Sequence, residues 1–431
     1  MNRVQWERDN SLIRDLELSQ TFLITLDISL WSGHSRKVEI AESFVQCLLT
    51  ILRRGGKFRS SGYEEVVIPP DCDEGTLQHV WETWVIRESF KRLCFRSMQH
   101  DSYSSMALLA KPLVSYAEVS VPFPDSFELW QASSAQEWAS IFSTHSNTRN
   151  VNLADYLDDP EGFYAGAHEV DVTIAESALL SCAWCLAWDY VQGNTMRRAS
   201  PRRWNSLLQA SRLDELLRLL TSFRLCAETT WTAKVAMRLE HILLHLHVPF
   251  EDIHVFAGME GPKQAQAVHS AVADWADTEA ARCAVWHAGQ VIREAKQLPP
   301  RTMQGSVVVM LYHAGLVLWA YGLLSSSGLA DDGWSNAVPA MAQGFQSVSL
   351  EEPEGISLQR FMQFGSGYPY IKEGLSPSSP DVFLSQPEKI LDVVVGILRD
   401  NHDDAPRPPI VERLIQLMLA VQQASRSQRH Q

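Results

Sequence analysis

Apolar residues recur at steps of three and four along most of this 431-residue chain. This spacing places side chains on one face of an α-helix, whereas a half-buried strand alternates apolar and polar residues. We find no hairpin pattern and no fixed-period repeat in the sequence. The pattern therefore predicts an all-α fold, a large multi-helix body without a significant β-sheet. The predicted helices cover residues 11–31, 37–54, 131–142, 150–160, 169–192, 204–223, 226–246, 261–298 (as one helix or two), 302–324, 386–400 and 410–424, and one more begins at 73–76.

Two long segments break the helical pattern. Residues 325–357 are rich in Gly, Ser, Ala and acidic residues, and residues 365–380 are rich in Gly, Ser and Pro. Such composition is typical of loops. It predicts a helical body over 1–325, a loop-rich linker over 326–380, C-terminal helices over 381–424 that pack on the body, and a polar tail over 425–431.

The most distinctive pattern lies between residues 76 and 138. Trp81, Trp84, Glu88 and Arg92 recur at three- and four-residue steps, so they share one face of a predicted helix. A second apolar face makes this helix apolar on two sides, which is typical of a helix buried among others. Because buried charges need partners, the four-residue step from Glu88 to Arg92 predicts an internal ion pair.

This stretch resembles the regulatory region of fungal zinc-finger transcription factors, also called the fungal-specific transcription factor domain or middle homology region. That region has paired Trp residues on a helix, then Glu, then Arg-Leu, an Asp near the helix end, a loop with Leu-Pro or Val-Pro, and Leu-Trp. The resemblance is closest to the branch whose fingers use two cysteines and two histidines. The matching residues here are Trp81, Trp84, Glu88, Arg92, Asp101, Pro122 and Trp130.

The resemblance implies a nuclear transcription regulator that controls a metabolic or secondary-metabolite gene set. It implies protein partners from the transcription machinery, or a partner that itself binds DNA, and no enzymatic activity. The family's zinc belongs to its finger, and none of the seven cysteines here lies in a two-cysteine, two-histidine finger or a six-cysteine cluster. We therefore expect no cofactor in this chain and only indirect contact with DNA.

Other interpretations stay open at this point. The chain is a regulatory half without its finger, a truncated gene model, or a co-regulator that acts through a partner. A helical enzyme of a biosynthetic pathway and a non-DNA-binding interaction protein are the alternatives from other functional classes. The oligomeric state is also open, with a homodimer as one alternative.

Charge and cysteine content agree with a regulatory protein that does not bind DNA itself. The formal net charge is −14, and an acidic chain repels phosphate backbones. Seven scattered cysteines favour a reducing compartment over a disulfide framework. We predict no membrane span, because the closest approach, residues 306–324, contains His313 and several small residues.

A pair of cysteines and a group of histidines, both common metal ligands, lack the further residues that would complete a metal site. Cys182 and Cys185 form a CxxC pattern, but they lie in an apolar helix, which favours two small buried side chains. His241, His245 and His247 lack the glutamate that follows the first histidine of a metalloprotease helix, because Ile242 follows His241 and Glu240 precedes it. The sequence therefore predicts a structural or surface role for these histidines and no bound zinc.

Clusters of like charge are predicted to lie in solvated loops. The acidic clusters at 331–332 and 400–404 resemble the magnesium-binding motifs of helical terpene cyclases, but their Gly- and Pro-rich flanks argue against one closed cavity. Two basic clusters are also predicted to lie in solvated loops. The alternative is that they act as nuclear import signals or as surface patches that bind a partner. These basic residues are Arg53, Arg54, Lys57 and Arg59, and Arg197, Arg198, Arg202 and Arg203.

Overall fold

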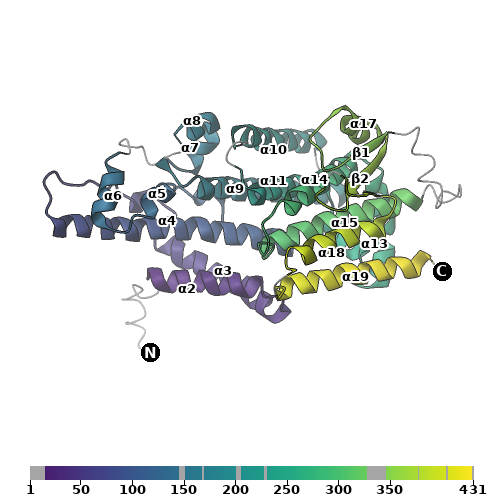
Figure 1. Ribbon diagram of the computed structural model, residues 1–431, viewed down its shortest axis with the longest axis horizontal. Coiled ribbons are helices and arrows are strands. Elements are labelled where there is room, and N and C mark those ends of the chain that lie inside the picture. The colour runs from purple at the N-terminus through teal and green to yellow at the C-terminus, as the bar shows by residue number, and fades with distance from the viewer. Residues whose placement is uncertain are drawn as a thin grey trace. The chain divides into compact units, whose positions relative to one another are not determined.

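The computed structural model confirms the predicted all-α fold (Figure 1). It describes residues 15–144, 151–166, 169–199, 205–227, 231–327, 346–376, 378–403 and 406–429. Within these residues the helices dominate, and the strands form a single three-stranded sheet. The chain divides into two compact units. The domain boundaries predicted from the sequence stay predictions.

The first unit comprises residues 1–30, 35–189 and 214–230. Its long central helix α4 packs against α2, α3 and α6. Helices α9 and α10 begin or end beyond the unit's boundaries. The helices are α2 (Leu16–Leu30), α3 (Ser35–Arg54), α4 (Glu74–Leu108), α5 (Phe127–Trp130), α6 (Ala135–Phe142), α7 (Leu153–Asp158), α8 (Pro160–Ala165), α9 (Val172–Ala199) and α10 (Ser206–Ala227), with short 3-10 turns at Ser60–Gly62 and Tyr116–Glu118.

Helix α4 begins where the sequence predicted it. The Asp73 side chain accepts a hydrogen bond from the Thr76 backbone N–H, which satisfies one of the free donors at the helix N-terminus. The helix then runs for 35 residues and ends before Leu109, whose φ of 50° is left-handed. Its buried side chains include Trp84, Glu88, Lys91 and Asp101, so charged groups are carried into the interior of the unit.

The second unit comprises residues 31–34, 190–213 and 231–431. Helix α14 packs against α11 and α15, and α18 and α19 pack on α15. The helices of this unit are α11 (Ala233–His247), α12 (Phe250–Phe256), α13 (Pro262–Ala276), α14 (Glu279–Lys296), α15 (Ser306–Ser327), α17 (Ile356–Phe364), α18 (Pro387–Asp400) and α19 (Pro409–Arg429). The strands are β1 (Ser347–Ser349), β2 (Tyr368–Lys372) and β3 (Asp381–Phe383).

The loop predictions for 325–357 and 365–380 are corrected where the structure describes these residues. Strands β1 and β2 lie there, with β1 parallel and β3 antiparallel to β2, and helix α17 starts at the end of the first predicted loop and fills the interval up to the second. Each strand has three to five residues, too few to show a two-residue period between glycines and serines. Residues 328–345, with the acidic pair at 331–332, lie outside the described residues.

Two glycines allow backbone segments to approach the helices closely. A Cβ added at Gly322 of α15 would lie 2.0 Å from the carbonyl oxygen of Leu384. One added at Gly289 of α14 would lie 2.5 Å from the carbonyl oxygen of Leu350. Leu350 follows β1 and Leu384 follows β3, so these glycines let the small sheet pack against α14 and α15.

One described helix is long and apolar enough to cross a membrane. This segment, Ser306–Ser325, falls within α15 and is mostly buried inside the protein. The core helix of a folded domain has the same length and composition, so the segment is weak evidence for a membrane span.

Candidate functional site

The residues of the sequence signature converge in the first unit around buried charges on α4. The Glu88 carboxylate is fully buried, and its Oε1 lies 2.5 Å from the Lys91 ammonium. The backbone N–H of Asp125 donates to Glu88 Oε2 at 3.0 Å. Lys91 also lies 3.7 Å from the Asp125 carboxylate and 3.5 Å from the Phe123 carbonyl oxygen. The loop after α4 is thus bound to the helix through Glu88 and Lys91.

The predicted ion pair between Glu88 and Arg92 is wrong. The Arg92 guanidinium lies 2.6 Å from the Asp171 carboxylate instead, and it donates to the Asp125 carbonyl oxygen at 3.1 Å. It also packs 4.6 Å from the Trp130 ring centroid. Glu88 has the nearer cation, Lys91, three positions along the helix. The sequence reasoning missed Lys91, although its three-residue step from Glu88 was a usable signal.

The buried position changes the titration of both members of the pair. Burial raises the pKa of Glu88 to about 7, although the Lys91 ammonium opposes this rise. Burial disfavours the Lys91 ammonium, but the carboxylates of Glu88 and Asp125 raise its pKa above the usual value. A carboxyl that titrates near neutral pH is therefore held inside the unit.

The signature tryptophans form an aromatic cluster beside these charges. Trp84 lies 6.1 Å from Trp130 and 5.6 Å from Trp138, measured between ring centroids. The Trp84 indole N–H donates to the Asp125 carboxylate at 2.7 Å. Trp81 is half-buried against this cluster. The tryptophans therefore form part of the core of the unit, and Trp84 also holds the loop before α5 through Asp125.

Two further signature residues hold the connecting loop. The Asp101 carboxylate accepts hydrogen bonds of 2.8 Å from the backbone N–H groups of Leu113 and Val114. Pro122 is buried and forms an isolated bridge with Asn152. The structure thus places the signature residues in two groups, with Trp81, Trp84, Glu88, Arg92 and Trp130 together, and with Asp101 and Pro122 at the loop.

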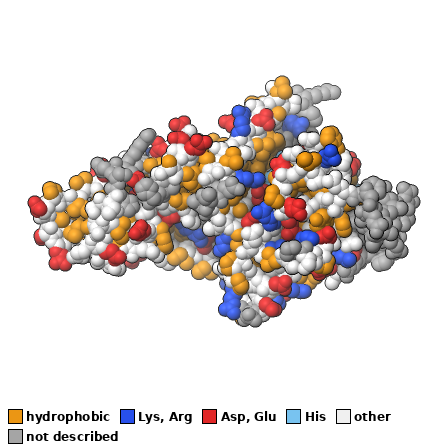
Figure 2. Space-filling view, turned by 45° about the horizontal axis from the view of Figure 1, so that its top comes forward, with side chains coloured by type: hydrophobic (Ala, Val, Ile, Leu, Met, Phe, Trp, Pro, Cys, Tyr) orange, Lys and Arg blue, Asp and Glu red, His pale blue; other side chains and the backbone are white. Residues whose placement is uncertain are grey.

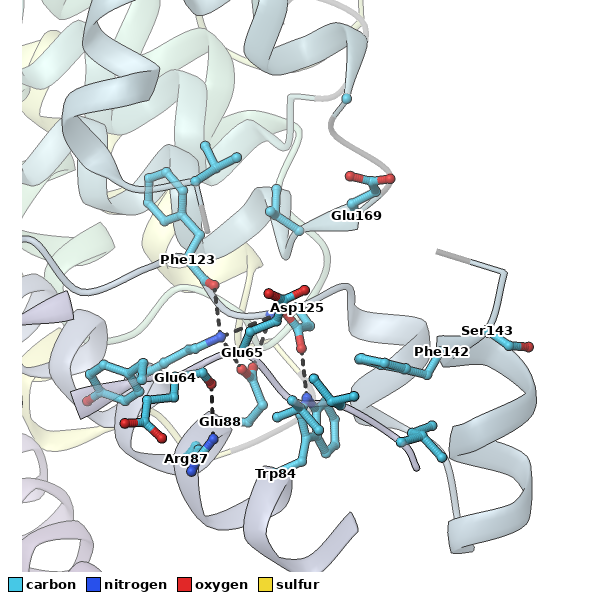
Figure 3. Close-up of a pocket in the computed structure, with 18 of the residues that line it drawn as sticks. Glu64, Glu65, Trp84, Arg87, Glu88, Phe123, Asp125, Phe142, Ser143 and Glu169 are labelled. Atoms are coloured by element: carbon cyan, nitrogen blue, oxygen red, sulfur yellow. Dashed lines mark hydrogen bonds and ion pairs between the residues drawn. The ribbon is translucent and has the colours of Figure 1, made fainter. Parts of the chain in front are cut away.

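A cavity of about 570 Å³ opens next to the buried charges (Figure 3). Figure 3 shows Glu88 directed toward Asp125, and Trp84 below Asp125 with its indole nitrogen bonded to that carboxylate. Both cations of the lining have partners, because Lys91 pairs with Glu88 and Arg87 donates to the Glu64 carbonyl oxygen. The charged and aromatic lining residues are Tyr63, Glu64, Glu65, Trp84, Arg87, Glu88, Lys91, Phe123, Asp125, Phe142, Phe163 and Glu169.

The lining determines what the cavity can bind. Its five carboxylates outnumber its two cations, and aromatic rings supply the apolar surface. Such a lining suits a small molecule that carries a cationic group beside an apolar one.

The basic clusters differ from their predicted loop setting. Arg53 and Arg54 end α3, and Arg53 pairs with Glu118 at 2.7 Å. Lys57 lies 3.5 Å from the Phe90 ring centroid. Arg197 belongs to α9, whereas Arg202 and Arg203 lie outside the described residues. Half of the first cluster is therefore engaged with other residues of the chain.

The CxxC cysteines lie in the interior of α9. Cys182 and Cys185 are both buried, and burial raises the pKa of the Cys182 thiol to about 12. The acidic cluster begins at Asp400, the last residue of α18, and the structure describes it as far as Asp403. Within it, His402 contacts the Met303 carbonyl oxygen at 2.8 Å. Asn401 donates to the Pro299 carbonyl oxygen. The described part of this cluster therefore joins the end of α18 to the segment between α14 and α15.

The histidines of α11 divide into two groups. His247 stacks on His287, which contacts the Glu240 carboxylate at 2.8 Å. His241 and His245 instead meet His313 of α15. His313 is 72 residues from His241 and lies in an apolar helix, so no local pattern in the sequence connects them.

Comparison with known proteins places the chain near fungal transcription factors. It is 22% identical over 402 residues to "Transcription factor 1" of Elsinoe fawcettii, and 26% identical over 352 residues to a protein of Zymoseptoria tritici that is also named a transcription factor. These matches cover 85% and 72% of the chain but 40% and 35% of the relatives. "Zinc finger protein klf1" of Schizosaccharomyces pombe matches 31% of the chain at 25% identity. No family model and no solved structure matches the chain.

Proposed function

We propose that this chain is the regulatory region of a fungal transcription regulator. The observation that carries the proposal is the similarity to two fungal proteins named transcription factors, which extends over most of the chain. These relatives support a role in transcription regulation, and nothing positive indicates an enzyme. The chain spans well under half of their length, so the activity of a whole regulator is part of the proposal.

The finer proposal is a nuclear protein that controls a metabolic or secondary-metabolite gene set, as its resemblance to the middle homology region implies. It contacts DNA indirectly, through the transcription machinery or a DNA-binding partner. The net charge of −14 supports this route, because acidic surfaces repel phosphates. On the face in Figure 2, Lys and Arg side chains lie interspersed with Asp and Glu side chains. The proposed role needs no catalytic cofactor.

Tethering tests the proposal directly. The full chain is fused to an unrelated DNA-binding module in fungal cells that carry a reporter gene with sites for that module. We expect reporter expression to change relative to the module alone and to the module fused to an unrelated acidic helical protein. A fluorescent fusion of the chain should also accumulate in the nucleus. Unchanged reporter expression from a well-expressed nuclear fusion would contradict the regulatory role.

A further inference from the structure

Three histidines meet in the interior of the second unit. His241 and His245 lie one turn apart on α11, so they share one face of that helix. Helix α15 packs against α11 and brings His313 to the same place. One ring nitrogen from each of the three lies within 4.8 Å of the other two, and all three side chains are buried.

The distances approach those of a metal site. His241 Nε2 lies 3.0 Å from His313 Nδ1, and the His241 and His245 ring centroids are 4.6 Å apart. In tetrahedral zinc sites the metal–nitrogen bonds of about 2.0–2.1 Å place ligand nitrogens about 3.3 Å apart. The spacing of the three nitrogens, within 4.8 Å of one another, is thus close to what one ion needs, and the rings would have to rotate to bind it together.

The surroundings favour rings that can bind a metal. All three side chains are buried, and burial disfavours the charged imidazolium, so each ring keeps a lone pair free for an ion. Phe250 lies 4.1 Å from the His245 ring and 4.7 Å from the His313 ring, so the cluster is lined by an apolar side chain.

His254, a residue of α12 beside this cluster, has a buried Nε2 without a hydrogen-bond partner in the described part of the chain. The His254 ring centroid lies 5.3 Å from that of His313, and its side chain is itself more than nine-tenths buried. Buried polar atoms without partners are uncommon in folded proteins, and a bound ion or water is one explanation for them.

We propose that His241, His245 and His313 bind one divalent transition-metal ion of the class that prefers imidazole, with Zn²⁺ as its representative. The group found in the described residues contains imidazoles alone, without a thiolate or carboxylate, which favours this class over Mg²⁺ or Ca²⁺. His254 or a hydroxide ion supplies the fourth position. Hydroxide would also offset part of the positive charge that the ion brings close to Arg238.

The sequence-based expectation that the chain holds no zinc stays a prediction, and the proposed site departs from it. That expectation rested on the lack of a closed ligand set around Cys182, Cys185, His241 and His245, whereas the proposed set adds His313. The ion would join α11 to α15 and stabilise the second unit, because metal binding to a folded site is linked to folding. The inference does not depend on the proposed function in transcription.

Elemental analysis of the full chain tests the site. The protein is prepared without a polyhistidine tag, incubated with Zn²⁺ and dialysed. We expect one zinc ion per chain, and loss of that ion in His241→Gln and in His313→Gln. The matched control is His269→Gln, which removes an exposed histidine of α13 and should leave the zinc content unchanged. Circular dichroism shows which variants retain the fold.

A second measurement does not depend on the variants. Wild-type protein loaded with Co²⁺ should show the visible absorption of tetrahedral coordination, and X-ray absorption at the zinc edge should show nitrogen and oxygen ligands that include imidazoles. Wild-type protein that retains no zinc after dialysis would overturn the site. So would folded variants with wild-type zinc content, or, where the variants unfold, a wild-type spectrum without imidazole ligands.

Discussion

Lys91 lies 2.5 Å from Glu88 inside the first unit, and both side chains are almost fully buried on α4. Two loop residues also bind the pair: the Phe123 carbonyl oxygen accepts from Lys91, and the Asp125 backbone N–H donates to Glu88. A buried pair of this kind adds little net stability by itself, but it is costly to break, because one charge then stays without its partner. The pair therefore makes the loop's position depend on both residues.

We expect Lys91→Met to lower the free energy of unfolding by about 3–5 kcal/mol. The substitution leaves the carboxylates of Glu88 and Asp125 without their shared cation. Chemical denaturation followed by tryptophan fluorescence measures the change, since Trp84 contacts Asp125. The double variant Glu88→Gln/Lys91→Met should lose less than the two single variants added together. Additive losses would mean that the two residues do not interact.

Glu88 should also make stability depend on pH. Its pKa is about 7 in the folded protein, against an ordinary value of 4.5. Because the folded value is the higher one, the folded state binds more protons between these values. The stability contributed by Glu88 is thus complete below about pH 4.5 and is lost as pH rises through about 7.

The measurement compares wild type with Glu88→Gln from pH 4.5 to pH 7. We expect wild type to lose roughly 1–3 kcal/mol relative to the variant across this range. Parallel stability profiles would show that Glu88 keeps one protonation state throughout.

Arg92 gives a test of the corrected pairing. We expect Asp171→Asn to destabilise the protein by about 2–3 kcal/mol, because it removes a buried charge-assisted hydrogen bond from Arg92. Arg92→Lys should have a similar effect, since lysine cannot bind Asp171 and the Asp125 carbonyl oxygen with one planar group. A double-mutant cycle between Arg92 and Asp171 should show coupling, whereas one between Arg92 and Glu88 should show much less.

These corrections show where sequence reasoning reached its limit. Helical spacing was enough to predict α4 and its buried charges, because that signal is local. The partner of Arg92 was not predictable in this way, since Asp171 is 79 residues away. The same limit applies to His313, which α15 brings to α11 from 72 residues away. Strands of three residues are too short to give a periodic signal at all.

Gly322 tests the close packing of α15 against the small sheet. Gly322→Ala should destabilise the protein by about 1–3 kcal/mol, because the new methyl group would lie 2.0 Å from a backbone oxygen of Leu384. Gly396→Ala in α18 is the matched control, since an added Cβ there has no atom within 4 Å. That control should stabilise the protein by about 0.5–1 kcal/mol through helix propensity alone. Thermal and chemical denaturation of both variants separates packing from propensity.

The last prediction concerns DNA. We expect the purified chain to bind duplex DNA no better than an unrelated acidic protein. Specific binding needs cations on the phosphates and a group that contacts the bases in a groove. The net charge of −14 opposes the first requirement, and Arg53 is already paired with Glu118. None of the cysteines of this chain has the spacing of a two-cysteine, two-histidine finger or a six-cysteine cluster, which are modules that meet the second requirement.

Fluorescence anisotropy with labelled duplexes at physiological salt measures this binding. The double variant Arg54→Ala/Arg59→Ala serves as the control, because these are the exposed cations of the first basic cluster. We expect equally weak binding by wild type and variant, with no preference among duplex sequences. Submicromolar, sequence-dependent binding that the double variant loses would show that this cluster contacts DNA directly, because each phosphate contact contributes to affinity and to its salt dependence.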